Sequence, residues 1–163
     1  MNIESFFPYR IAITAEAFSR QLVAVYGRTY GLSREEWRLL FLLEDAGELN
    51  SLQIPQRTSL DKVQVSRAAS RLEAKGLILR SIPGSDRRLR VYRITQKGRE
   101  LFSRAFCEVE ARATEILAAM PEADREALFR GIAALDQAIA STPRDDPGAQ
   151  SHPRPGDGAD RAE

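Results

Sequence analysis

The sequence predicts a mainly α-helical chain with one small β-hairpin near its middle. Three observations support this fold class. Apolar residues recur at helical spacing along most of the chain, helix-capping residues precede several of these stretches, and two strand-like runs flank a cluster of turn residues. At 163 residues, the chain is long enough to bury a core as a single domain.

The first helix is expected from Phe7 to about Tyr30. Pro8 fits its first turn, and Gly31 follows as a helix-ending glycine. Apolar residues occupy more than one side of this helix, because a second set beginning at Tyr9 lies off the main stripe. One side can pack in the chain's own core and the other needs a partner, which indicates oligomerisation.

A second helix is expected from Arg34 to about Asp45, ended by Gly47. Ser33 and Glu36 have capping-box spacing at its start. The residues it is expected to bury are Trp37, Leu40, Phe41 and Leu43. A short helix should follow over residues 51–58, where Pro55 either lies in the first turn or distorts the helix.

A fourth helix begins after Asp61, which has Gln64 three residues later, and it runs to Lys75 before Gly76. Two strands are expected at 77–82 and 89–95, joined by turn residues 83–88. Long helices should then cover about 96–119 and 122–140. The Pro- and Gly-rich residues 141–163 have almost nothing to bury, so we expect a disordered tail.

The charge of the chain is concentrated in one block. The whole chain has a net charge of +1, but residues 61–99 carry 11 basic and 3 acidic side chains, between two segments that are net acidic. A dense positive block of this kind is typical of a phosphate-binding surface. The alternative, a solvated charged face, normally mixes both signs.

Composition disfavours several other classes of protein. The chain has one cysteine, Cys107, and one histidine, His152, so we expect no metal site, no cofactor, no catalytic residues and no enzyme. Charged residues interrupt every apolar stretch, and the first residues lack the pattern of a secretory leader. We therefore expect a cytoplasmic protein without a membrane partner.

Two short helices followed by a basic hairpin predict a winged helix-turn-helix. With Val65, Ala68, Ala69 and Leu72 buried, the opposite side of the second helix carries small polar, apolar and basic residues. Such a face suits the major groove of DNA, although Val63 could alternatively pack on the preceding helix. The residues expected to contact DNA from this helix are Lys62, Val63, Gln64, Ser66, Arg67 and Arg71.

The hairpin is expected to supply a second DNA contact. Its tip carries Asp86, Arg87 and Arg88, and Arg90 follows on the returning strand. A guanidinium at the end of a ribbon can enter the minor groove, and Asp86 would orient a neighbouring arginine or cap the turn. An exposed basic loop without a DNA contact is the alternative.

Several segments together resemble the MarR family of bacterial transcriptional regulators. The Asp-x-Arg pattern of the wing falls on Asp86 and Arg88, and the pattern that follows it reads Ile94-Thr95-Gln96-Lys97-Gly98. The other segments that carry the resemblance are Gly31–Arg38, Thr58–Ala68 and Arg71–Ile78. The family's peroxide sensors use a cysteine in the first helix, whereas Cys107 lies in the fifth, so this form of sensing is not expected.

This resemblance implies a homodimer that binds a palindromic operator in double-stranded DNA as a repressor and is released by a small, often aromatic, effector. The implied organisation is a dimerisation helix (1–32), a DNA-binding winged helix-turn-helix (33–95), C-terminal dimerisation helices (96–140) and the tail. The residues that could line an effector pocket are Arg20, Tyr26, Trp37 and Phe41, although each could instead serve core packing or an ion pair. A winged-helix protein-interaction module without DNA binding is the alternative function.

Overall fold

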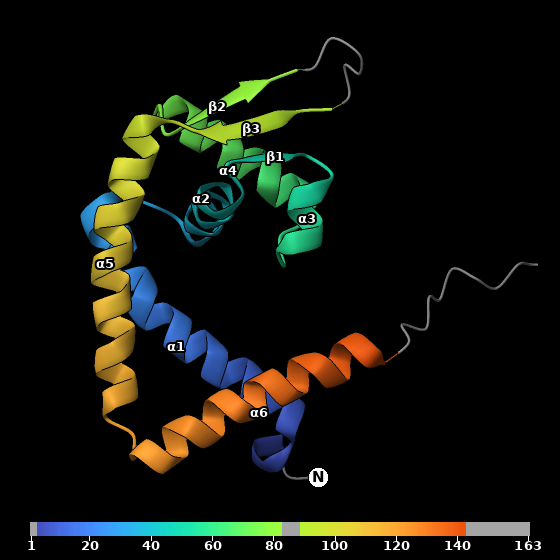
Figure 1. Cartoon of the computed structure of the whole chain (residues 1–163), viewed down its shortest axis with the longest axis vertical. Coiled ribbons are helices and arrows are strands. Elements are labelled where there is room, and N and C mark those ends of the chain that lie inside the picture. The colour runs from blue at the N-terminus through green and yellow to red at the C-terminus, as the bar shows by residue number, and fades with distance from the viewer. Residues whose placement is uncertain (1–2, 83–88, 143–163) are drawn as a thin grey trace, which may run out of the picture. The chain divides into compact units, whose positions relative to one another are not determined.

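The computed structural model describes residues 3–82 and 89–142 of the chain. Helices dominate and the β structure is small, which confirms the predicted fold class (Figure 1). The described elements are η1 (Ile3–Ser5), α1 (Phe7–Tyr30), α2 (Arg34–Ala46), β1 (Glu48–Asn50), α3 (Gln53–Arg57), α4 (Lys62–Ala74), β2 (Ile78–Ser81), β3 (Val91–Ile94), α5 (Gln96–Ala118) and α6 (Glu122–Ser141). The tail predicted to be disordered lies outside the described residues from position 143 onward.

The chain divides into two units, residues 1–119 and residues 120–163. The first unit holds the helices α1 to α5 and the sheet, and the described part of the second unit is mainly α6. Within the described residues, no helix is both long enough and apolar enough to cross a membrane. The sequence-based division into dimerisation and DNA-binding segments stays a prediction.

The three strands form one antiparallel sheet in the order β1-β3-β2. Tyr92 at the centre of β3 lies opposite Leu49 on one neighbour and Arg80 on the other. The strand β1 was not predicted, because three residues are too few to show a period of two. The two predicted strands are shorter than expected, at Ile78–Ser81 and Val91–Ile94. Just beyond their paired residues, the Thr95 amide donates to the Leu77 carbonyl oxygen at 3.0 Å.

The helix boundaries follow the predicted capping chemistry closely. The Glu36 amide donates to the Ser33 hydroxyl at 3.3 Å, and the Ser33 amide donates back to the Glu36 carboxylate at 2.7 Å. Pro55 is the third residue of the short helix α3, so it lies in the first turn, where no intrahelical amide bond is lost. The three glycines predicted to end helices, Gly31, Gly47 and Gly76, all have positive φ.

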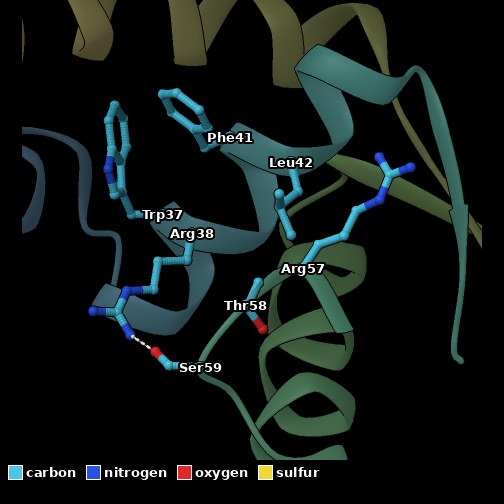
Figure 2. A pocket seen from close by; sticks show the side chains of 7 residues that line it. All are labelled: Trp37, Arg38, Phe41, Leu42, Arg57, Thr58 and Ser59. Atoms are coloured by element: carbon cyan, nitrogen blue, oxygen red, sulfur yellow. Dashed lines mark hydrogen bonds between the residues drawn. The ribbon is translucent and has the colours of Figure 1, made fainter. Parts of the chain in front are cut away.

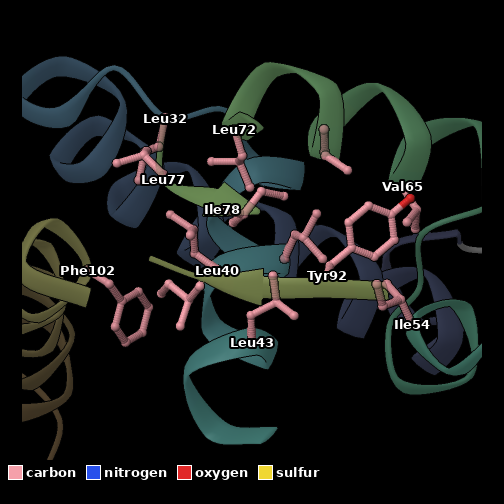
Figure 3. Close-up of a cluster of buried hydrophobic side chains, with 14 of the residues drawn as sticks. Leu32, Leu40, Leu43, Ile54, Val65, Leu72, Leu77, Ile78, Tyr92 and Phe102 are labelled. Carbon is pink, nitrogen blue, oxygen red and sulfur yellow. The ribbon is translucent and has the colours of Figure 1, made fainter. Parts of the chain in front are cut away.

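The core lies between α2, α4 and the sheet, and one side of α5 packs against it (Figure 3). The residues buried on α4 are those predicted: Val65, Ala68, Ala69 and Leu72.

The prediction for α2 was partly wrong. Leu39 is fully buried, whereas Phe41 is 44% exposed and Trp37 is only half-buried. The buried stripe of α2 runs through Leu39, Leu40 and Leu43, and at 100° per residue Phe41 points away from its centre.

The end of α4 is held tightly against the start of α5. The Thr95 hydroxyl donates to the Gly76 carbonyl oxygen at 2.9 Å and also accepts the Gly98 amide as the helix cap. Lys97 Nζ donates to the Lys75 carbonyl oxygen at 2.8 Å. A Cβ atom at Gly98 would lie 2.1 Å from the Leu77 carbonyl oxygen, so this approach is possible only for glycine.

We predict that Gly98→Ala lowers the free energy of unfolding by about 1–3 kcal/mol or more, because the added methyl group forces apart two packed backbones. Thermal or urea unfolding measures this loss. Gly131→Ala is the control, since a Cβ there meets no other atom within 4 Å and alanine favours a helix. Equal stability of the two variants would contradict the tight packing of α5 on the end of α4.

Candidate nucleic-acid interface

The first turn of α4 is closed by a capping box that orients the helix start. The Gln64 amide donates to the Asp61 carboxylate at 2.8 Å, and the Asp61 amide donates to the Gln64 side-chain oxygen at 3.0 Å. Gln64 is exposed, as predicted for a DNA contact, but its oxygen is engaged in the cap. Its NH₂ group remains the part that can donate to a base edge.

Three residues on the outward face of α4 are exposed: Lys62, Val63 and Arg67. Val63 is 56% exposed, which favours an outward position over burial against the preceding helix. Lys62 and Arg67 are exposed, and neither has a carboxylate within ion-pair distance among the described residues. Ser66 is half-buried beside them. The face therefore presents uncompensated positive charge and one β-branched apolar group to solvent.

Arg71 is placed differently from the other predicted α4 residues. Its guanidinium turns back to the start of α2, where it donates to the Ser33 hydroxyl at 3.3 Å and lies 3.5 Å from the Glu36 carboxylate and 3.9 Å from that of Glu35. These contacts make Arg71 a residue that positions α4. Its DNA contact stays a prediction.

A buried carboxylate joins α2 to the end of α4. Glu36 is only 2% exposed, and its Oε1 accepts a 2.8 Å hydrogen bond from Lys75 Nζ. The same ammonium group donates to the Gly31 carbonyl oxygen at 2.8 Å. One lysine thus connects the end of α4 both to the end of α1 and to the start of α2.

Nearby hydrogen-bond donors lower the pKa of two carboxyl groups close to the start of α2. The Ser33 hydroxyl donates to Glu35 at 2.8 Å and holds the pKa of that carboxyl below its ordinary value. Arg34 donates both guanidinium arms to Glu16 of α1, at 2.7 and 2.9 Å, and lowers the pKa of Glu16 in the same way. Both carboxylates therefore stay ionised under neutral conditions.

The hairpin is described only in part. Arg90 is exposed just before β3, whereas Asp86, Arg87 and Arg88 lie outside the described residues, so their predicted contacts stay predictions. Arg93 on the outer side of β3 forms an ion pair with Glu48 of β1. That pairing could not be found in the sequence, because β1 itself was not predicted.

A pocket of about 370 Å³ opens between α2 and the turn after α3 (Figure 2). Trp37 and Phe41 project in the same direction from α2 and line one side of the pocket, and Arg38 donates to the Ser59 hydroxyl at 2.8 Å. The seven lining residues are Trp37, Arg38, Phe41, Leu42, Arg57, Thr58 and Ser59.

The structure brings together only some of the predicted effector residues. Tyr26 is buried and stacks on Trp37 with ring centroids 4.9 Å apart, and burial raises the pKa of its hydroxyl. Arg20 is exposed on α1 and does not line the pocket. The basic residues that do line it, Arg38 and Arg57, were missed, because arginines on α2 and α3 carry no local signal of a shared cavity.

Residues 30–89 of this chain, from the last residue of α1 to just before β3, match the model of the MarR family. Over this segment the chain is similar to the MarR family. It is 30% identical over 105 residues to the HTH-type transcriptional regulator YdgJ of Bacillus subtilis, and the match covers 64% of each protein.

Several solved structures share the fold over most of the chain. A MarR/EmrR family regulator from Acinetobacter sp. ADP1 superposes with a TM-score of 0.72 and 25% identity, covering 87% of this chain and all of the other. BpsR of Bordetella bronchiseptica, whose DNA binding is regulated by 6-hydroxynicotinic acid, gives a TM-score of 0.72 at 18% identity, covering 88% of this chain and 99% of BpsR.

Proposed function

We propose that this protein is a homodimeric transcriptional repressor of the MarR type that acts in the cytoplasm and binds a palindromic operator in double-stranded DNA. The observation that carries the proposal is the outward face of α4, where Val63, Arg67 and Lys62 are exposed and no described carboxylate pairs with either cation. In this arrangement α4 enters the major groove and the β2–β3 hairpin lies along the neighbouring backbone.

The chemistry of this face fits the major groove. A guanidinium such as that of Arg67 can donate two hydrogen bonds to a guanine edge, and an apolar group such as Val63 can contact a thymine methyl. Lys62 at the start of α4 supplies charge for a phosphate. A protein-binding module would instead expose an apolar or acidic face here.

The proposed homodimer rests on large apolar side chains that are exposed to solvent on α1 and α6. At the start of α1, Phe7 is 60% exposed and Ile13 is 46% exposed. On α6, Phe129 and Ile139 are 54% and 59% exposed. Large exposed apolar surface is unfavourable in a monomer, and a second copy of the chain would cover it.

Arg67→Ala tests the DNA-binding proposal on a duplex selected from a random-sequence library with the wild-type protein. We expect the variant to lose about 1–3 kcal/mol of binding free energy and to relax base preference at one symmetric pair of positions. Fluorescence anisotropy at fixed salt measures the affinity. Arg104→Ala is the matched control, since it removes the same charge from an exposed position on α5. Equal affinities for the two variants would show that α4 contributes only net charge.

We further propose that an aromatic carboxylic acid is the effector and that it occupies the pocket between α2 and the turn after α3. Trp37 and Phe41 offer ring surfaces, while Arg38 and Arg57 offer guanidinium groups for a carboxylate. The regulation of BpsR by 6-hydroxynicotinic acid supports this ligand class.

The pocket is joined directly to the DNA-binding helix. Ser59, which accepts the Arg38 hydrogen bond, precedes the cap residue Asp61 of α4 by two positions. A carboxylate bound to Arg38 would compete with Ser59 for the guanidinium. Release of Ser59 would free the turn that sets the start of α4, which weakens DNA binding.

Quenching of Trp37, the chain's single tryptophan, reports binding in this pocket directly. We expect 6-hydroxynicotinic acid to quench it, and Arg38→Ala to weaken this binding by about 10- to 100-fold through loss of a charge-assisted hydrogen bond. The corresponding carboxamide, which is neutral, should bind weakly to both the wild-type protein and Arg38→Ala. If Arg20→Ala abolishes binding and Arg38→Ala does not, the effector occupies another site.

A further inference from the structure

A second recess of about 280 Å³ lies where the turn after β1, the first turns of α4 and the start of β3 meet. Its polar lining comes from Ser51, Lys62, Ser66, Arg90 and Tyr92. Two of these side chains are cationic, three carry hydroxyl groups, and none is a carboxylate. This composition suits an oxyanion.

Tyr92 is the residue that indicates a ligand. It is 2% exposed, and its ring packs in the core with the hydroxyl end beside Val65 (Figure 3). The hydroxyl makes no hydrogen bond to any described residue. Every fully buried side-chain nitrogen or oxygen atom among the described residues has a hydrogen-bond partner. Because the Tyr92 hydroxyl has none, its oxygen must retain some contact with solvent. A buried tyrosine hydroxyl usually has a partner, and here the open side leads into the recess.

The charges beside this hydroxyl are also uncompensated. Lys62 and Arg90 are exposed, and no described carboxylate lies within ion-pair distance of either. The Ser51 hydroxyl accepts the Arg90 amide at 3.4 Å, which holds the base of the hairpin beside the recess. The positive end of the α4 dipole lies at the same place, since Lys62 is the first residue of that helix.

We propose that this recess binds one phosphodiester of the DNA backbone, with Tyr92 Oη as a neutral donor and Lys62 and Arg90 as the cations. The proposal rests on the DNA-binding function inferred above. A free oxyanion would use the same chemistry, but the recess lies between the α4 face and the base of the hairpin. A strand that passes from the major groove towards the hairpin crosses this position. Such a contact fixes the register of α4 in the groove without reading a base.

Tyr92→Phe tests the proposal because it removes one hydroxyl and keeps the buried ring. We expect operator affinity to fall about three- to tenfold, the range for a single neutral hydrogen bond. The slope of log affinity against log salt should stay unchanged, since no charge is lost. Arg90→Ala should weaken binding and reduce that slope by about one. Tyr30→Phe is the control, because its hydroxyl bonds to Glu108 on α5 and should not affect DNA affinity.

Each other outcome is decisive. If Tyr92→Phe binds the operator as tightly as wild type while Arg67→Ala is weakened, the recess is not a phosphate site and the DNA-binding proposal stands. If inorganic phosphate binds the wild-type protein and not Tyr92→Phe, with operator affinity unchanged, the recess holds a free anion and the proposal is wrong. If the wild-type protein selects no duplex at all, the proposed function itself fails.

Discussion

The position of α4, the helix proposed to enter the DNA groove, depends on a buried carboxylate. Glu36 caps the start of α2 through the Ser33 amide and receives Lys75 from the end of α4, while only 2% exposed. A buried charge destabilises the folded state unless it is paired and hydrogen-bonded. The favoured arrangement of α2 and α4 is therefore the one in which Glu36 keeps these partners. Apolar packing of Leu72 and Leu40 would tolerate small shifts between the helices, whereas this network does not.

Helix α4 is also held at both ends, by α5 at its end and by the turn after α3 at its start. Its end meets α5 through Gly98 and Lys97, and its start follows the turn that holds Ser59. A change at the pocket beside Arg38, or a shift of α5, therefore acts on α4 through a few identifiable hydrogen bonds. These contacts give a physical route from the proposed effector pocket to the side chains that we propose contact DNA.

Local chemistry was readable from the sequence, whereas side-chain partnerships across the fold were not. Capping residues, the buried side of α4 and the exposed Val63 follow from spacing within one helix, so each was predicted correctly. The strand β1 was missed because three residues carry no periodic signal. Phe41 was expected in the core, but the buried stripe of α2 is centred on Leu39 and its neighbours. The contact of the Arg71 guanidinium with α2 and the unbonded hydroxyl of Tyr92 depend on which elements pack together. The spacing of residues along the chain does not determine this packing.

A double-mutant cycle on Glu36 and Lys75 tests the central claim most directly. Glu36→Gln keeps the capping geometry and removes the charge, Lys75→Met removes the cation, and urea unfolding gives the free energy of each variant and of the pair. We expect both single changes to be destabilising, with a coupling energy of about 0.5–3 kcal/mol between them. Glu16→Gln, which breaks an exposed ion pair with Arg34, should cost much less. A coupling energy of zero would show that apolar packing alone holds α4 in place.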